Sequence, residues 1–115
     1  MKIAIAQIDF TIGAFEANLE AMAAAVTQAR SAAADLVVFT ELATVGYPPG
    51  DLLERPEFID RNLEQLARVA ALSDERIGIL VGFVERNESG AGKALHNAAA
   101  LCHRGRVGDS PRKCL

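Results

Sequence analysis

Apolar residues fall into short runs and helical stripes that alternate along the chain. Short apolar runs are typical of buried strands, and apolar residues spaced three and four apart are typical of one face of a helix. This pattern predicts strands at residues 2–7, 36–39, 76–84 and 95–102, and helices at about residues 15–33 and 56–70. The order strand, helix, strand, helix, strand, strand predicts an α/β fold, with a mixed sheet and helices on one or both faces.

Each predicted helix has one apolar stripe that faces the sheet. The stripe residues are Phe15, Leu19, Met22 and Val26 in the first helix, and Ile59, Leu63, Leu66, Val69 and Ala70 in the second. Pro56 suits the first position of the second helix, because the missing N–H of proline has no partner to lose there. Both segments are therefore expected to be amphipathic helices of a single domain.

The last two predicted strands are expected to pair as a hairpin. Residues 87–92 between them are rich in glycine and polar residues, which favour a turn. Gly105 predicts a further turn. The tail from there to Leu115 has no clear hydrophobic period, so its sequence does not distinguish a strand from a loop.

Composition excludes several classes of protein. The chain has 115 residues, of which 50% are hydrophobic and 23% charged, which indicates one folded domain. Its net charge of -3 and its 5% aromatic content do not suit nucleic-acid binding. No apolar run approaches the roughly 20 residues of a membrane span. Two cysteines do not form a disulfide framework, so a cytoplasmic protein with neither nucleic-acid nor membrane partners is expected.

Glu41 is the strongest candidate for chemistry. It comes two residues after the apolar run that ends at Phe39, and ligands of open α/β sheets gather outside the carboxyl ends of strands. Burial beside an apolar floor raises the pKa of a carboxyl group and suits it to act as a general base. A solvated glutamate at a strand end is the alternative. The rigid loop that follows, with Pro48 and Pro49, favours a site.

Several motifs make the chain similar to the carbon–nitrogen hydrolase (nitrilase) superfamily. Phe39-Thr40-Glu41-Leu42 is followed by Gly46-Tyr47-Pro48-Pro49 and then by Asp51-Leu52-Leu53. This combination resembles the branch of glutamine-dependent NAD synthetases. The opening strand, Gly82-Phe83, His96-Asn97-Ala98-Ala99 and Arg112-Lys113 resemble further parts of the family pattern, so the resemblance covers essentially the whole chain.

The resemblance implies a fold, a reaction and roles for two residues. The fold is an α-β-β-α sandwich, of which residues 1–115 supply the N-terminal part of a glutaminase domain. In the family reaction a cysteine thiolate attacks an amide, here that of glutamine, and ammonia is released. Glu41 takes the place of the general base, and Lys113 that of the residue that stabilises the oxyanion. Apart from the resemblance, Tyr47 is expected to shape or close the pocket, because its rigid proline neighbours fix its direction. A packed aromatic residue of the loop is the alternative.

The family nucleophile has no counterpart in the chain. It is expected a few dozen residues beyond Lys113, so the isolated chain is expected to be inactive. Cys114 follows Lys113 directly, and adjacent side chains of an extended segment point to opposite faces. Cys102 lies in a predicted strand and is expected to be a small buried apolar residue. Pro111 and its neighbours, which directly precede Arg112-Lys113, differ from the family pattern. The alternative interpretation of Lys113 is a solvated charge at the end of a strand.

The resemblance also implies partners that act elsewhere. ATP, Mg and deamido-NAD are implied for a synthetase domain outside this segment, and the intact enzyme is expected to be a homo-oligomer. No cofactor is expected here, because no glycine-rich phosphate loop is present. No metal is expected either, since His96 and His103 have no suitable further ligands nearby. Two alternatives remain: another amidase of the superfamily, or a non-catalytic dimerising module or gene remnant.

Overall fold

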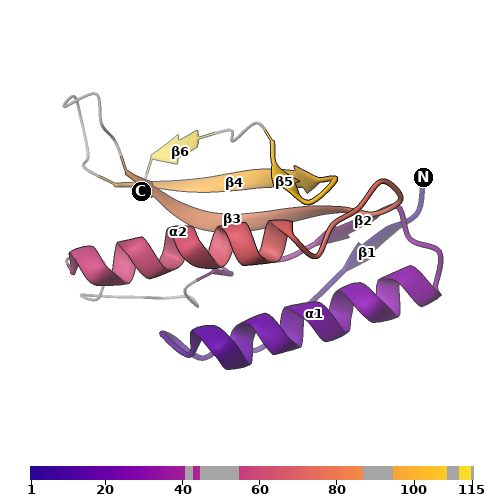
Figure 1. Cartoon of the computed structure of the whole chain (residues 1–115), viewed down its shortest axis with the longest axis horizontal. Coiled ribbons are helices and arrows are strands. Elements are labelled where there is room, and N and C mark those ends of the chain that lie inside the picture. Colours follow the sequence, from indigo (N-terminus) through magenta and orange to yellow (C-terminus); the bar gives the residue numbers. More distant parts are fainter. Residues whose placement is uncertain (41–42, 45–54, 87–94, 109–111, 115) are drawn as a thin grey trace.

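The computed structural model describes residues 1–40, 43–44, 55–86, 95–108 and 112–114 as a two-layer α/β arrangement (Figure 1). The helices are α1 (Phe15–Ser31) and α2 (Pro56–Ala70). The strands are β1 (Ile3–Ile5), β2 (Leu36–Val38), β3 (Gly78–Arg86), β4 (Leu95–His103), β5 (Arg106–Val107) and β6 (Arg112–Cys114). The predicted α/β class and the predicted order of elements are confirmed, and the open tail contains β5 and β6.

The strands form one mixed sheet in the order β1-β2-β3-β4-β5, with β6 also paired to β4. The pairs β1–β2 and β2–β3 are parallel, whereas β3–β4, β4–β5 and β4–β6 are antiparallel. The predicted hairpin of β3 and β4 is confirmed. Both helices lie on the same side of the sheet (Figure 1). Of the two arrangements that the sequence allowed, helices on one face or on both, the described part of the chain therefore has the first.

The core lies between this helical layer and the sheet. Met22 and Val26 of α1 and Leu66 and Val69 of α2 are buried, as the two stripes predicted. They pack in one cluster with alternate residues of the strands, which include Val37, Ile79, Val81, Phe83, Ala98, Ala100 and Cys102. Leu19 and Leu63 are only partly buried at the margin of this cluster.

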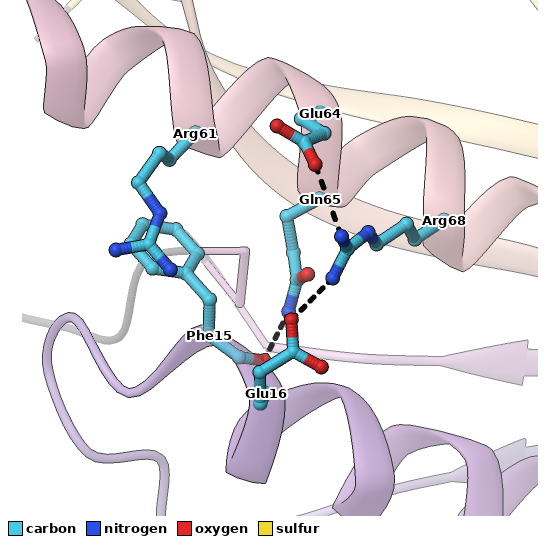
Figure 2. Close-up of a pocket in the computed structure, with 6 residues that line it drawn as sticks. All are labelled: Phe15, Glu16, Arg61, Glu64, Gln65 and Arg68. Atoms are coloured by element: carbon cyan, nitrogen blue, oxygen red, sulfur yellow. Dashed lines mark hydrogen bonds and ion pairs between the residues drawn. The ribbon is translucent and has the colours of Figure 1, made fainter.

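A polar junction joins the beginning of α1 to α2 (Figure 2). The buried Gln65 side chain donates a hydrogen bond of 2.7 Å to the backbone oxygen of Phe15. The Arg61 guanidinium lies 4.4 Å from the centre of the Phe15 ring, and Arg68 pairs with Glu16. The cavity among these side chains has a volume of about 30 Å³, which suits about one water molecule. We therefore interpret the junction as structural.

Part of the opposite face of the sheet is apolar and exposed in the described residues. Ile5, Val38, Leu80 and Leu101 occupy one register row across four neighbouring strands. Ile5 is 73% exposed and Leu101 47% exposed, whereas Val37 and Ile79, which alternate with this row, are fully buried. Around this row the period of two thus separates buried residues from exposed apolar ones, whereas further along β3 both Phe83 and Val84 are buried.

Candidate active site

The candidate site lies where β2 ends and β3 continues. The backbone N–H and C=O groups of the even-numbered residues of β3 point away from β4, toward the side of β3 on which β2 lies. The N–H of Phe39 donates to the oxygen of Leu80 at 2.8 Å, just beyond the last residue of β2. Two residues further along β3, the oxygen of Gly82 accepts a hydrogen bond of 3.3 Å from the N–H of Thr44. The segment that leaves β2 is therefore attached to β3 at two successive points.

Asn62 of α2 provides the third attachment along this edge. Its side-chain nitrogen donates to the oxygen of Val84 at 2.6 Å, and its side-chain oxygen accepts from the N–H of Val84 at 2.9 Å. The same oxygen accepts a hydrogen bond of 2.6 Å from the hydroxyl group of Thr44. Asn62, Thr44 and Val84 are all fully buried. Buried backbone groups must find partners, and at Val84 the Asn62 amide provides the pair of hydrogen bonds that a neighbouring strand would otherwise make.

Glu41 and Tyr47 lie outside the described residues, so their roles stay predictions. Phe39, two residues before Glu41, and Ala43, two residues after it, are described. Phe39 and Ala43 are buried, at 5% and 0% exposure, and both belong to the main core cluster. The two ends of the segment that carries this carboxylate are thus held by packed residues.

Lys113 lies in β6, at the same end of the sheet. Its backbone is the register partner of Asn97 in β4, which in turn is the partner of Val84 in β3. Neighbouring strands are about 4.8 Å apart, and three such spacings separate β6 from the line of β2, so the two are roughly 14 Å apart. The backbone of Lys113 is thus aligned across the sheet with Val84, and Asn62 contacts Val84 from the other side of β3. The catalytic role of Lys113 stays a prediction.

Cys102 is unsuited to nucleophilic attack. Its side chain is fully buried in the core, as the sequence predicted, and desolvation raises the pKa of the thiol to about 11. A thiol with such a pKa is almost entirely protonated near neutral pH, and the thiolate is the reactive form. Arg112–Cys114 is extended, which is the backbone conformation that the argument against Cys114 requires.

The raised pKa of Cys102 gives a testable pH dependence. The folded state holds the thiol proton more tightly than the unfolded state, in which the pKa is near 9. We expect this contribution to stability to be complete below pH 9 and to be lost as the pH rises from about 9 to about 11.

Urea unfolding of the Cys114→Ser variant over this pH range measures the effect, with the variant that also carries Cys102→Ala as the control. An equal fall in both proteins would show that Cys102 is not the cause. In the Cys114→Ser variant at pH 8, a thiol reagent is expected to modify Cys102 rapidly only after unfolding.

A larger cavity lies at the other end of the strands. It has a volume of about 300 Å³ and is lined by Arg30, Ala33, Ala34, Asp35, Arg76 and Ile77. It is close to the amino ends of β2 and β3, whereas ligands of α/β sheets bind at the carboxyl ends. Arg30 pairs with Asp74, whose pKa is lowered mainly by the backbone N–H of Arg76 and then by Arg30. These contacts stabilise the turn that precedes β3, so we do not place the active site in this cavity.

No metal site is formed by the residues that the structure describes, because no group of three His, Cys, Asp or Glu side chains comes together among them. His103 instead contacts the backbone oxygen of Glu75 at 3.2 Å. Within the same described ranges, neither helix is long and apolar enough to cross a membrane.

The sequence reasoning missed Thr44 and Asn62. A signal was available for Asn62, because it lies three residues after Ile59 and four before Leu66, on the apolar stripe of α2. A polar residue on such a stripe is expected to find a buried partner. Nothing in the local pattern identifies the partner, since Thr44 is 18 residues away in sequence.

Comparison with known proteins agrees with this geometry. The profile of the carbon-nitrogen hydrolase family matches residues 2–113. A glutamine-dependent NAD(+) synthetase of Synechocystis sp. is 40% identical over 116 residues, which cover 98% of this chain and 21% of that protein. A synthetase of the same name from Xanthomonas campestris pv. campestris is 39% identical over 114 residues, covering 98% and 20%. The chain thus spans about a fifth of the length of these relatives.

Solved structures show the same fold. The glutamine-dependent NAD+ synthetase of Acinetobacter baumannii superimposes with a TM-score of 0.84 at 33% identity, over 96% of this chain and 20% of that one. An amidase of the nitrilase superfamily from Nesterenkonia superimposes with a TM-score of 0.82 at 20% identity, over 98% and 42%. The predicted nitrilase-like fold is confirmed, and the chain belongs to the carbon-nitrogen hydrolase family.

Proposed function

We propose that this chain is the N-terminal part of the glutaminase unit of a glutamine-dependent NAD synthetase. The observation that carries the proposal is the 40% identity with the Synechocystis synthetase along 98% of the chain. The similarity to the Nesterenkonia amidase is 20% and supports the fold alone. The motif from Glu41 to Leu53, which resembles the synthetase branch, points in the same direction.

In this proposal the chain provides two of three catalytic groups. Glu41 accepts the proton of a cysteine thiol, and the thiolate attacks the side-chain amide of glutamine. Lys113 stabilises the oxyanion of the tetrahedral intermediate. Protonated Glu41 gives its proton to the leaving nitrogen, ammonia departs, and Glu41 then accepts a proton from the water that hydrolyses the thioester. Tyr47 shapes the pocket for glutamine. The nucleophilic cysteine comes from outside residues 1–115, because Cys102 is buried and protonated.

The proposal assigns ATP, Mg and deamido-NAD to a separate synthetase domain, where ammonia amidates deamido-NAD. The proposal places no step that uses these groups in residues 1–115. We also propose a cytoplasmic location and a homo-oligomeric intact enzyme. The first is supported by the small number of cysteines and the second by the resemblance to the synthetase branch.

A chimera tests the proposed function. Residues of this chain replace the segment of the Synechocystis synthetase to which they align, which covers 98% of the chain. We expect the chimera to form NAD from deamido-NAD and ATP with glutamine as the nitrogen source. Ammonium in place of glutamine is the internal control, because it bypasses the glutaminase and reports the synthetase domain alone.

A chimera that uses ammonium but not glutamine, beside a parent that uses both, would contradict the proposal and favour a non-catalytic module. Hydrolysis of simple aliphatic amides in preference to glutamine would favour the alternative of another amidase of the superfamily.

A further inference from the structure

We propose that the larger cavity, near the amino ends of β2 and β3, binds a free α-amino acid, whose carboxylate contacts Arg76 and whose ammonium group contacts Asp35. The cavity has a volume of about 300 Å³, at the lower end of the range of small-molecule sites. It lies at the opposite end of the strands from the candidate active site. The inference therefore goes beyond the proposed function and does not depend on it.

The cavity has two walls that the sheet joins. One wall is formed by residues 33–35, between α1 and β2, and the other by residues 76–77, at the entry to β3. The N–H of Gly78 donates a hydrogen bond of 2.9 Å to the backbone oxygen of Asp35, and parallel pairing begins directly afterwards, with Leu36 opposite Gly78. The positions of the two walls are thus fixed relative to each other by the backbone.

Two opposite charges line this cavity without pairing with each other. Arg76 and Asp35 are both exposed, and neither forms an ion pair with any residue in the described ranges. The Asp35 carboxylate accepts a hydrogen bond of 2.8 Å from the backbone N–H of Lys2, which holds it in place but does not neutralise its charge. The backbone N–H of Arg76 donates to the Asp74 carboxylate at 2.8 Å, which fixes the start of the arginine side chain.

The neighbouring charged groups are engaged in contacts of their own. The Arg30 guanidinium, which also lines the cavity, pairs with Asp74. The Lys2 ammonium group donates a hydrogen bond of 2.6 Å to the backbone oxygen of Ala32, just after the end of α1. A ligand of this cavity therefore meets one guanidinium and one carboxylate that have no ion-pair partner in the described part of the chain.

An α-amino acid carries the two charges that complement this pair. Its carboxylate can accept two parallel hydrogen bonds from the Arg76 guanidinium, and its ammonium group can donate to Asp35. A simple anion would be repelled by Asp35, and a simple cation would be repelled by Arg76. Ala34 and Ile77, which are 7% and 1% exposed, add apolar surface to the lining for the side chain of the ligand.

Saturation-transfer NMR with L-alanine as the probe tests the site in the 115-residue chain. We expect L-alanine to bind saturably. L-lactate and ethylamine each lack one of the two charged groups and should bind at least about tenfold more weakly. Arg76→Gln and Asp35→Asn each remove one charge with little change of size, and each should weaken L-alanine binding at least about tenfold. Arg76→Lys keeps the charge but not the fork of donors, so an intermediate affinity is expected.

Arg106→Gln and Asp9→Asn are the matched controls, because each removes one charge from an exposed side chain outside the cavity. Both should bind L-alanine like the wild type, and circular dichroism shows whether each variant keeps the fold. Equal binding of L-alanine and L-lactate would overturn the inference, because the site would then recognise an anion only. Binding that Arg76→Gln leaves unchanged would place the ligand elsewhere. Absence of saturable L-alanine binding, in the chain and in the chimera alike, would overturn the inference while the proposed function stands.

Discussion

Substitution of Glu41 by glutamine in the chimera is expected to lower glutamine-dependent NAD synthesis by about 10²- to 10⁴-fold, the usual contribution of a general base. Glutamine has nearly the same size and can still accept a hydrogen bond, so the segment between Phe39 and Ala43 should keep its place. It cannot take the proton of the attacking thiol. Ammonium-dependent synthesis should be unchanged, since it does not use this step.

Glu20→Gln is the control for the loss of one negative charge, because Glu20 is exposed on α1 and should not affect either activity. A single-turnover measurement with glutamine reports whether the thioester still forms. Glutamine-dependent activity that survives Glu41→Gln would show that Glu41 is a solvated strand-end glutamate, which was the alternative from the sequence pattern.

The isolated 115-residue chain is expected to self-associate through the open face of its sheet. Ile5 is 73% exposed and Leu101 47% exposed, on the same register row as Val38 and Leu80. Open apolar faces of this kind favour association. Each isoleucine or leucine buried in an interface contributes roughly 1.5–3 kcal/mol. The double variant Ile5→Lys and Leu101→Lys should therefore weaken association at least ~100-fold.

Sedimentation velocity over a range of concentrations measures this effect. Ile12→Lys is the matched control, because Ile12 is 39% exposed but lies in the loop before α1 rather than in the sheet. The control should associate like the wild type. A wild-type chain that is monomeric at all concentrations, with a sharp two-state melt, would contradict the prediction.

The boundaries of the elements show where the sequence pattern is insufficient. The third strand was predicted at residues 76–84 and is found at Gly78–Arg86. The Asp74 carboxylate accepts hydrogen bonds from the N–H groups of Arg76 and Ile77 and holds them in a turn. Pairing with Leu95 then extends the strand to Arg86. Both causes are contacts between residues, and neither changes the hydrophobic period.

The end of the first helix has a similar explanation. Helical periodicity and a run of alanines predicted a helix to about Ala33, whereas α1 ends at Ser31. Ala33 has a φ of 60°, a left-handed conformation that only a minority of non-glycine residues adopt. The N–H of Ala34 bonds to the oxygen of Ala29, which closes the helix end. Alanine favours helix everywhere in the run, so its propensity could not indicate where the helix stops.

Local sequence pattern was sufficient to predict the α/β class, the order of the elements before the tail and the covered faces of both helices, because hydrophobic periods of two and 3.6 residues are local properties. The motif around Glu41 also led to the family. The placement of both helices on one side of the sheet and the alignment of Lys113 with Val84 become known only from the folded chain. It alone joined Asn62 to Thr44, since a buried amide finds its partners through the packing of α2 against β3, which no local pattern records.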